Sequence, residues 1–80
     1  MSRITVIGAG SWGTTLAALL VRNGHDVVLW ALEPEVAEQV TRERENGRFL
    51  AGVRLPAAMS ATSDLAAALN RAEVLVNVVP

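Results

Sequence analysis

Cysteine and lysine are both absent from this chain of 80 residues, and aromatic side chains make up only 4% of it. The lack of cysteine excludes disulfides and thiolate metal sites. The seven basic residues are all arginine, and eight acidic residues bring the formal net charge to −1. Because the arginines form no cluster interleaved with aromatic residues, we expect neither nucleic acid nor an anionic membrane as a partner.

Long hydrophobic runs are missing as well. The amino-terminal end has neither the extended apolar stretch nor the cleavage site of a secretory signal, and no segment approaches membrane-spanning length. The absence of cysteine is compatible with a reducing, cytoplasmic setting. Hydrophobic residues make up 51% of the chain, as in a globular protein. Eighty residues are only just enough to bury one small core.

The most informative motif present is a set of three glycines, Gly8, Gly10 and Gly13, which follows a strand-like run at 3–7. In such a turn the first glycine permits the bend, the second lets the backbone approach phosphates, and the third lets helix and strand pack closely. A helix that begins there presents free N–H groups and the positive end of its dipole. The motif predicts a pyrophosphate site of a dinucleotide, and a ligand-free structural turn is the alternative.

Apolar runs alternate with helical segments along the chain, which predicts an α/β fold of Rossmann type. Asn23-Gly24 and Asn46-Gly47 are stop signals for the first two helices, and Ser63 is the expected cap of the third. We expect a partial, doubly wound parallel sheet in the order 3-2-1-4, with residues 48–56 as a loop. The predicted elements are strands at 4–7, 27–31, 59–62 and 74–79 and helices at 11–23, 34–46 and 64–70.

Three further residues are candidates for contact with the dinucleotide. Ser11 and Trp12 occupy the phosphate-facing turn, where the Ser11 hydroxyl can donate to a phosphate oxygen. Trp12 either lies against the ligand or forms an apolar plug over the sheet edge. Glu33 follows Gly13 by twenty positions, where a carboxylate accepts hydrogen bonds from ribose hydroxyls and repels a 2′-phosphate. Alternatively, Glu33 only starts a helix beside Pro34, and Ala31 and Leu32 of the same turn are equally well placed for the ribose contact.

The remaining polar residues predict no catalytic centre. His25 lies at the end of the sheet opposite the phosphate turn, so we expect a structural role. Asn77 lies in an apolar strand, where its amide bonds either backbone or ligand. There is no Ser/His/Asp set and no cluster with metal-ligand spacing. The chain is therefore expected to hold a cofactor without supplying the acid or base for hydride transfer.

Several segments together carry a family resemblance. The glycine turn lies within ITVIGAGSWG at 4–13, a pattern common to many dehydrogenases, and RNGHDVVLWA follows at 22–31. More distinctive are NGRFLAGVRLP at 46–56 and ATSDL at 61–65, before a final VVP. In order and spacing, essentially the whole chain resembles the amino-terminal part of the bacterial NAD(P)-dependent glycerol-3-phosphate dehydrogenases.

This resemblance implies an enzyme that uses NAD(P)H to reduce dihydroxyacetone phosphate to sn-glycerol 3-phosphate, a precursor of glycerophospholipids, in the cytoplasm. It implies that Ser11, Trp12, Leu32 and Phe49 lie against the cofactor, and that Pro80 begins a loop over the nicotinamide half. The lysines and the helical substrate domain of the family are missing from these residues. We therefore expect an amino-terminal part of a dinucleotide-binding domain that is inactive alone. A small phosphorylated substrate would bind the complete enzyme, and association into a homo-oligomer stays open.

Position 32 departs from the family pattern, in which arginine or histidine commonly meets the 2′-phosphate of NADP. Leu32 lacks that charge and Glu33 beside it is repulsive, so NADH is the expected preference unless Arg42, Arg44 or Arg48 reaches the phosphate. Two other functions stay open. One is a non-catalytic nucleotide-binding regulatory module, and the other is a Rossmann reductase of the ketopantoate or hydroxyacid type.

Overall fold

The fold is built on a four-stranded sheet in which every strand pair is parallel, in the order β3-β2-β1-β4. The computed structural model describes residues 2–78. This topology confirms the predicted Rossmann-type sheet. The elements in chain order are β1 (Arg3–Ile7), α1 (Ser11–Arg22), β2 (Asp26–Trp30), α2 (Pro34–Glu43), β3 (Ser60–Thr62), α3 (Leu65–Leu69) and β4 (Val74–Asn77).

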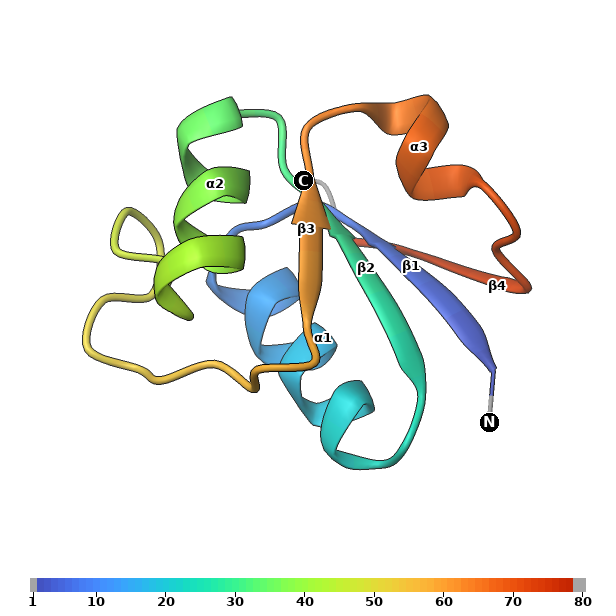
Figure 1. Ribbon diagram of the computed structural model, residues 1–80, viewed down its shortest axis with the longest axis horizontal. Coiled ribbons are helices and arrows are strands. Elements are labelled where there is room, and N and C mark those ends of the chain that lie inside the picture. Colours follow the sequence, from blue (N-terminus) through green and yellow to red (C-terminus); the bar gives the residue numbers. More distant parts are fainter. Residues whose placement is uncertain (1, 79–80) are drawn as a thin grey trace.

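Helices cover both faces of the sheet, as Figure 1 shows. Right-handed crossovers place α1 and α2 on the same face, because the strands that they connect advance in one direction across the sheet. The step from β3 to β4 reverses that direction, so α3 lies on the opposite face. Parallel sheets bind their ligands at such a reversal, outside the carboxyl ends of the strands. In residues 2–78, no helix is long and apolar enough to cross a membrane.

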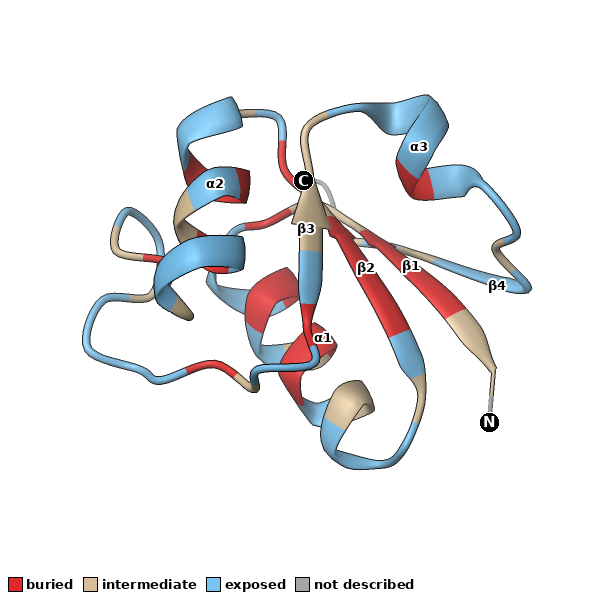
Figure 2. Cartoon of the chain, viewed as in Figure 1, coloured by how far each residue is buried: buried red, intermediate tan, exposed pale blue. Residues whose placement is uncertain are grey.

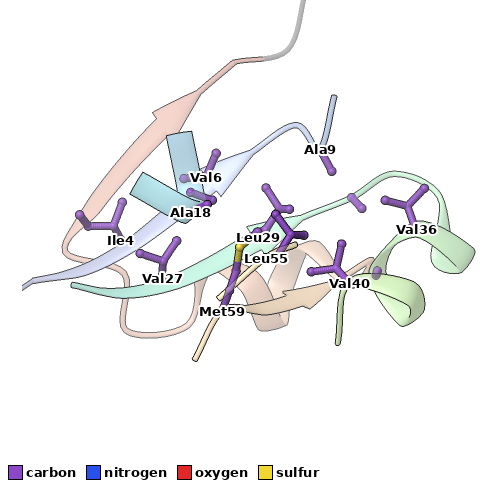
Figure 3. Packing of buried hydrophobic residues seen from close by; sticks show 13 residues of the cluster. Ile4, Val6, Ala9, Ala18, Val27, Leu29, Val36, Val40, Leu55 and Met59 are labelled. Carbon is purple, nitrogen blue, oxygen red and sulfur yellow. The ribbon is translucent and has the colours of Figure 1, made fainter. Parts of the chain in front are cut away.

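The hydrophobic core lies on one face of the sheet, between the strands and the helices α1 and α2 (Figure 2, Figure 3). Toward the sheet α1 presents small residues, so that Ala17 and Ala18 are buried whereas Leu19 is 51% exposed. Small side chains allow the helix backbone to approach the strands closely. The larger side chains of the core come from the strands, α2 and the loop before β3: Ile4, Val6, Val27, Leu29, Val36, Val40, Leu55 and Met59.

The opposite face of the sheet is covered by the short helix α3. Thr5 of β1 is fully buried there, and its hydroxyl donates to the backbone carbonyl of Ala68. Asp64 caps α3, because its carboxylate accepts a hydrogen bond of 3.2 Å from the N–H of Ala67. The predicted cap at Ser63 is therefore wrong by one residue, although the helix itself is confirmed.

The second helix also ends earlier than the sequence suggests. Pro34 begins α2 as predicted, but the helix stops at Glu43, and Arg44 forms the C-cap in the left-handed conformation with φ of 59°. Asn46-Gly47 is therefore not the helix stop. Instead, Asn46 lies in the following loop with its side chain fully buried.

The exposed edge of the sheet should cause the isolated 80-residue chain to self-associate. β4 is an edge strand in which Val74 and Leu75 are 43% and 56% exposed, and α3 leaves Leu65 and Leu69 exposed as well. An unpaired apolar edge promotes association between copies. We expect sedimentation velocity to detect self-association of the isolated chain, and Leu75→Lys to reduce it by adding a charge beside the edge. A cooperative thermal transition of a stable monomer would contradict this expectation.

Candidate functional site

The glycine turn joins β1 to α1 at the carboxyl edge of the sheet. Gly8 has φ of 116°, a conformation that residues with a side chain rarely adopt. Its N–H donates to the carbonyl of Trp30, the last residue of β2, over 3.1 Å. This hydrogen bond ties the start of the turn to the neighbouring strand. The turn is thereby fixed beside the segment that follows β2.

Gly13 lets α1 approach the end of β1 very closely. A Cβ atom built on Gly13 would lie 1.7 Å from the carbonyl oxygen of Gly8 and 2.8 Å from a side-chain carbon of Val78. Because the nearer of these atoms belongs to the backbone, no change of rotamer could make room for it. The absence of a side chain at position 13 therefore determines where the first turn of α1 lies.

The amino-terminal end of α1 is open to a ligand. Gly10 is the N-cap residue and has no side chain with which to cap the helix, and the first turn contains no acidic residue. Apart from its chain neighbours, a Cβ atom built on Gly10 would find no atom of residues 2–78 within 4 Å. The first N–H groups of a helix have no acceptor within the helix, and they carry the positive end of its dipole. This arrangement is suited to a phosphate group, which would supply both acceptors and negative charge.

Two predicted site residues, Ser11 and Trp12, lie exposed in this first turn. Together with Thr15 they line a shallow hollow of about 200 Å³. The indole of Trp12 is 81% exposed. It therefore does not form the apolar plug over the sheet edge that was one of the two alternatives.

The turn after β2 lies at the same edge of the sheet, because Ile7 and Trp30 are register partners at the ends of adjacent parallel strands. Leu32 is 70% exposed there. Glu33 is the N-cap residue of α2, but its side chain makes no capping hydrogen bond. The structure thus brings Leu32 and Glu33 to the edge that carries the glycine turn.

Two arginines are paired with glutamates along α2. The guanidinium of Arg42 lies 3.1 Å from the carboxylate of Glu38, and that of Arg48 lies 3.1 Å from the carboxylate of Glu35. Arg48 also lies over the ring of Phe49, 5.2 Å from its centroid. These pairs are on the surface, where each contributes roughly 0.2–1 kcal/mol. They line a charged groove of about 340 Å³ along α2.

Asn46 is the residue at this site that sequence reasoning missed. Its Nδ2 donates to the carbonyl oxygen of Ala9 over 2.8 Å and to the hydroxyl of Thr14 over 2.9 Å. Its Oδ1 accepts from the N–H of Phe49 over 3.2 Å. The side chain thus connects the glycine turn to the loop that carries Phe49. An asparagine before a glycine is typical of a helix stop, and only its place in the distinctive run at 46–56 points to another role.

The other candidates fall in different places. His25 accepts a hydrogen bond from the N–H of Ser2 at the opposite end of the sheet, in agreement with a structural role. Asn77 ends β4 and is paired in register with Ile7, which places it at the candidate site's edge. Pro80 lies outside the described residues. Over residues 2–78, no group of three His, Cys, Asp or Glu side chains could hold a metal ion.

The comparison with known families agrees with this geometry. The model of the family described as NAD-dependent glycerol-3-phosphate dehydrogenase N-terminus matches residues 3–80. The chain belongs to this family. Among its relatives, the glycerol-3-phosphate dehydrogenase (NAD(P)+) of Bacillus mycoides is 49% identical over 80 residues, and that of Chlorobium limicola is 52% identical over 77. The chain spans 24% and 23% of the length of these two enzymes.

Solved structures of glycerol-3-phosphate dehydrogenases share the fold. The enzyme of Coxiella burnetii superimposes with a TM-score of 0.89 at 38% identity, over 99% of this chain and 24% of that one. The enzyme of Plasmodium falciparum gives a TM-score of 0.88 at 30% identity, over 99% and 25% of the two chains. The described residues therefore correspond to about a quarter of a glycerol-3-phosphate dehydrogenase.

The different surroundings of two glycines lead to a prediction for the full-length protein. Gly13→Ala is expected to destabilise it by about 3 kcal/mol, because the added methyl group meets the backbone of the turn. Gly10→Ala is the matched control and should cost less than about 1 kcal/mol, since its methyl group enters open space. Unfolding in urea, followed by circular dichroism, measures both. Equal loss of stability in the two variants would contradict the proposed packing role of Gly13.

Proposed function

We propose that this chain binds NAD(P)H as the amino-terminal part of a dinucleotide-binding domain, in an enzyme that reduces dihydroxyacetone phosphate to sn-glycerol 3-phosphate. The observation that carries the proposal is the uncapped end of α1 behind the glycine turn, at the point where the strand order of the sheet reverses. Membership of the family supports the choice of reaction.

In this proposal the glycine turn holds the pyrophosphate. Gly8 shapes the bend, Gly10 lets the phosphates approach the backbone, and Gly13 seats α1 against β1. The N–H groups of the first turn and the hydroxyl of Ser11 donate to phosphate oxygens. The exposed indole of Trp12 supplies an apolar surface beside the dinucleotide.

The turn after β2 and the loop after α2 contact the adenosine half. Glu33 accepts hydrogen bonds from the ribose hydroxyls, and Leu32 lies beside it as an apolar contact. Phe49 presents its ring, 38% exposed, from the neighbouring loop. Pro80 is assigned to the loop that passes over the nicotinamide half.

Catalysis requires more of the protein than these 80 residues. When bound, the reduced nicotinamide supplies a hydride to the ketone carbon of the substrate. This chain's residues bind and orient the dinucleotide, whereas the groups that hold the substrate phosphate and transfer the proton belong to the rest of the enzyme. The product is a precursor of glycerophospholipids, and we place the reaction in the cytoplasm.

Calorimetric titration of the full-length protein with NADH tests binding, and oxidation of NADH on addition of dihydroxyacetone phosphate tests the reaction. Gly10→Ala should weaken binding of NADH about tenfold or more, because its methyl group enters the space assigned to the phosphates. Failure of the unmodified protein to bind would overturn the proposal. Binding without turnover would instead favour the non-catalytic regulatory module.

A preference for NADH over NADPH is a further prediction for the full-length protein. Leu32 carries no charge and Glu33 repels a 2′-phosphate, so NADH should bind about tenfold more tightly, which corresponds to about 1.4 kcal/mol. Leu32→Arg should raise the affinity for NADPH about tenfold with little effect on NADH. Leu32→Met is the control and should change neither affinity. Stronger binding of NADPH than of NADH by the unmodified protein would refute the predicted preference.

A further inference from the structure

A single peptide group links the buried side chain of Asn46 to the candidate phosphate site. The carbonyl of Ala9 accepts hydrogen bonds from the amide of Asn46 and, over 3.3 Å, from the hydroxyl of Thr14. Two donors on one carbonyl hold the peptide plane between Ala9 and Gly10. Because a trans peptide is planar, its C=O and N–H point in opposite directions. With the carbonyl held toward the buried amide, the N–H of Gly10 is directed away from the protein interior, toward the open end of α1.

The other end of the same side chain holds the loop that carries Phe49. Besides the bond from the N–H of Phe49 to Oδ1, the N–H of Leu50 donates to the backbone carbonyl of Asn46 over 2.7 Å. The side chain of Gln39 on α2 accepts from the N–H of Gly47 over 2.9 Å. The turn at 46–50 is therefore joined to α2 through the side chain of Gln39. Among these hydrogen bonds, only those of the Asn46 side chain join it to the glycine turn. Only two hydrogen bonds separate the backbone of Phe49 from that of Ala9.

The amide of Asn46 is suited to this position for a chemical reason. It offers a donor toward Ala9 and Thr14 and an acceptor toward Phe49, and a buried amide whose hydrogen bonds are made is rigid. Aspartate would have no donor for the carbonyl of Ala9. An aliphatic residue would leave that carbonyl without its strongest partner and the N–H of Phe49 without an acceptor.

We propose that Asn46 is a positioning residue for the dinucleotide. Its one side chain sets the Gly10 N–H for the pyrophosphate and the ring of Phe49 for the adenosine half at the same time. This inference rests on the proposed function and deepens it. A purely structural role for Asn46 would change stability alone, whereas a positioning role changes affinity beyond what the loss of stability explains.

The first test compares affinities for NADH in the full-length protein by calorimetry. Asn46→Ala is expected to raise the Kd about tenfold, as substitution of supporting residues around a bound group commonly does. Thr5→Val is the matched control, because it also removes a buried hydrogen bond to a backbone carbonyl, but on the opposite face of the sheet. It should lower the melting temperature and leave the Kd unchanged. Equal Kd values for Asn46→Ala and Thr5→Val would overturn the inference.

The second test is a double-mutant cycle with Phe49→Ala. If Asn46 acts partly by placing the Phe49 ring, its substitution costs less affinity once that ring is gone. We expect the effect of Asn46→Ala to fall from about tenfold to about threefold in the Phe49→Ala background. If the double variant raises the Kd by the product of the two single effects, the substitutions act independently, which would contradict the link between Asn46 and Phe49.

Variants of Thr14 keep the inference testable if Asn46→Ala does not fold. Thr14→Val removes the hydroxyl that accepts from Asn46 and donates to Ala9, and it should raise the Kd about threefold. Thr14→Ser keeps the hydroxyl and should restore affinity. An unchanged Kd in Thr14→Val would contradict the positioning role of Asn46 but would leave the proposed function intact. Failure of the unmodified protein to bind NADH would remove the proposed function and, with it, the inference.

Discussion

The close approach of Gly13 to the carbonyl of Gly8 is the constraint on which the rest of the site depends. A Cβ atom at position 13 would lie 1.7 Å from that oxygen, so the helix can begin where it does only with glycine there. This contact sets α1 so that its uncapped end opens at the carboxyl edge of the sheet. The positive end of the helix dipole and the N–H groups of the first turn therefore lie at the point where the strand order reverses.

The packed face of the sheet provides stability, and the carboxyl ends of its strands present the candidate site. The face covered by α1 and α2 contains the large apolar side chains, and the small residues of α1 let helix and strands pack closely. The turns that follow β1 and β2 emerge from this packed layer. Rigid elements thus support short turns, and the side chains of Asn46 and Thr14 hold the peptide group between Ala9 and Gly10.

Features encoded locally could be predicted from the sequence, and features that depend on distant contacts could not. The spacing of Gly8, Gly10 and Gly13 and the alternation of apolar and helical segments were sufficient for the topology, because parallel strands and right-handed crossovers leave few arrangements. Asn46 was misread because its side-chain partners Ala9 and Thr14 lie 37 and 32 residues away. An irregular loop has no periodicity from which its contacts with a remote turn could be inferred.

The exposure of Trp12 has a consequence for how this molecule can be observed. Its indole is 81% exposed, whereas the indole of Trp30 donates to the carbonyl of Ser63 in a partly buried setting. A water-exposed indole fluoresces at longer wavelength than a shielded one, so the two emissions of this chain differ. The emission of either indole overlaps the absorption of a reduced nicotinamide but not that of an oxidised one. Under the proposed function, Trp12 in the first turn of α1 would therefore act as an optical reporter of the redox state of the bound dinucleotide.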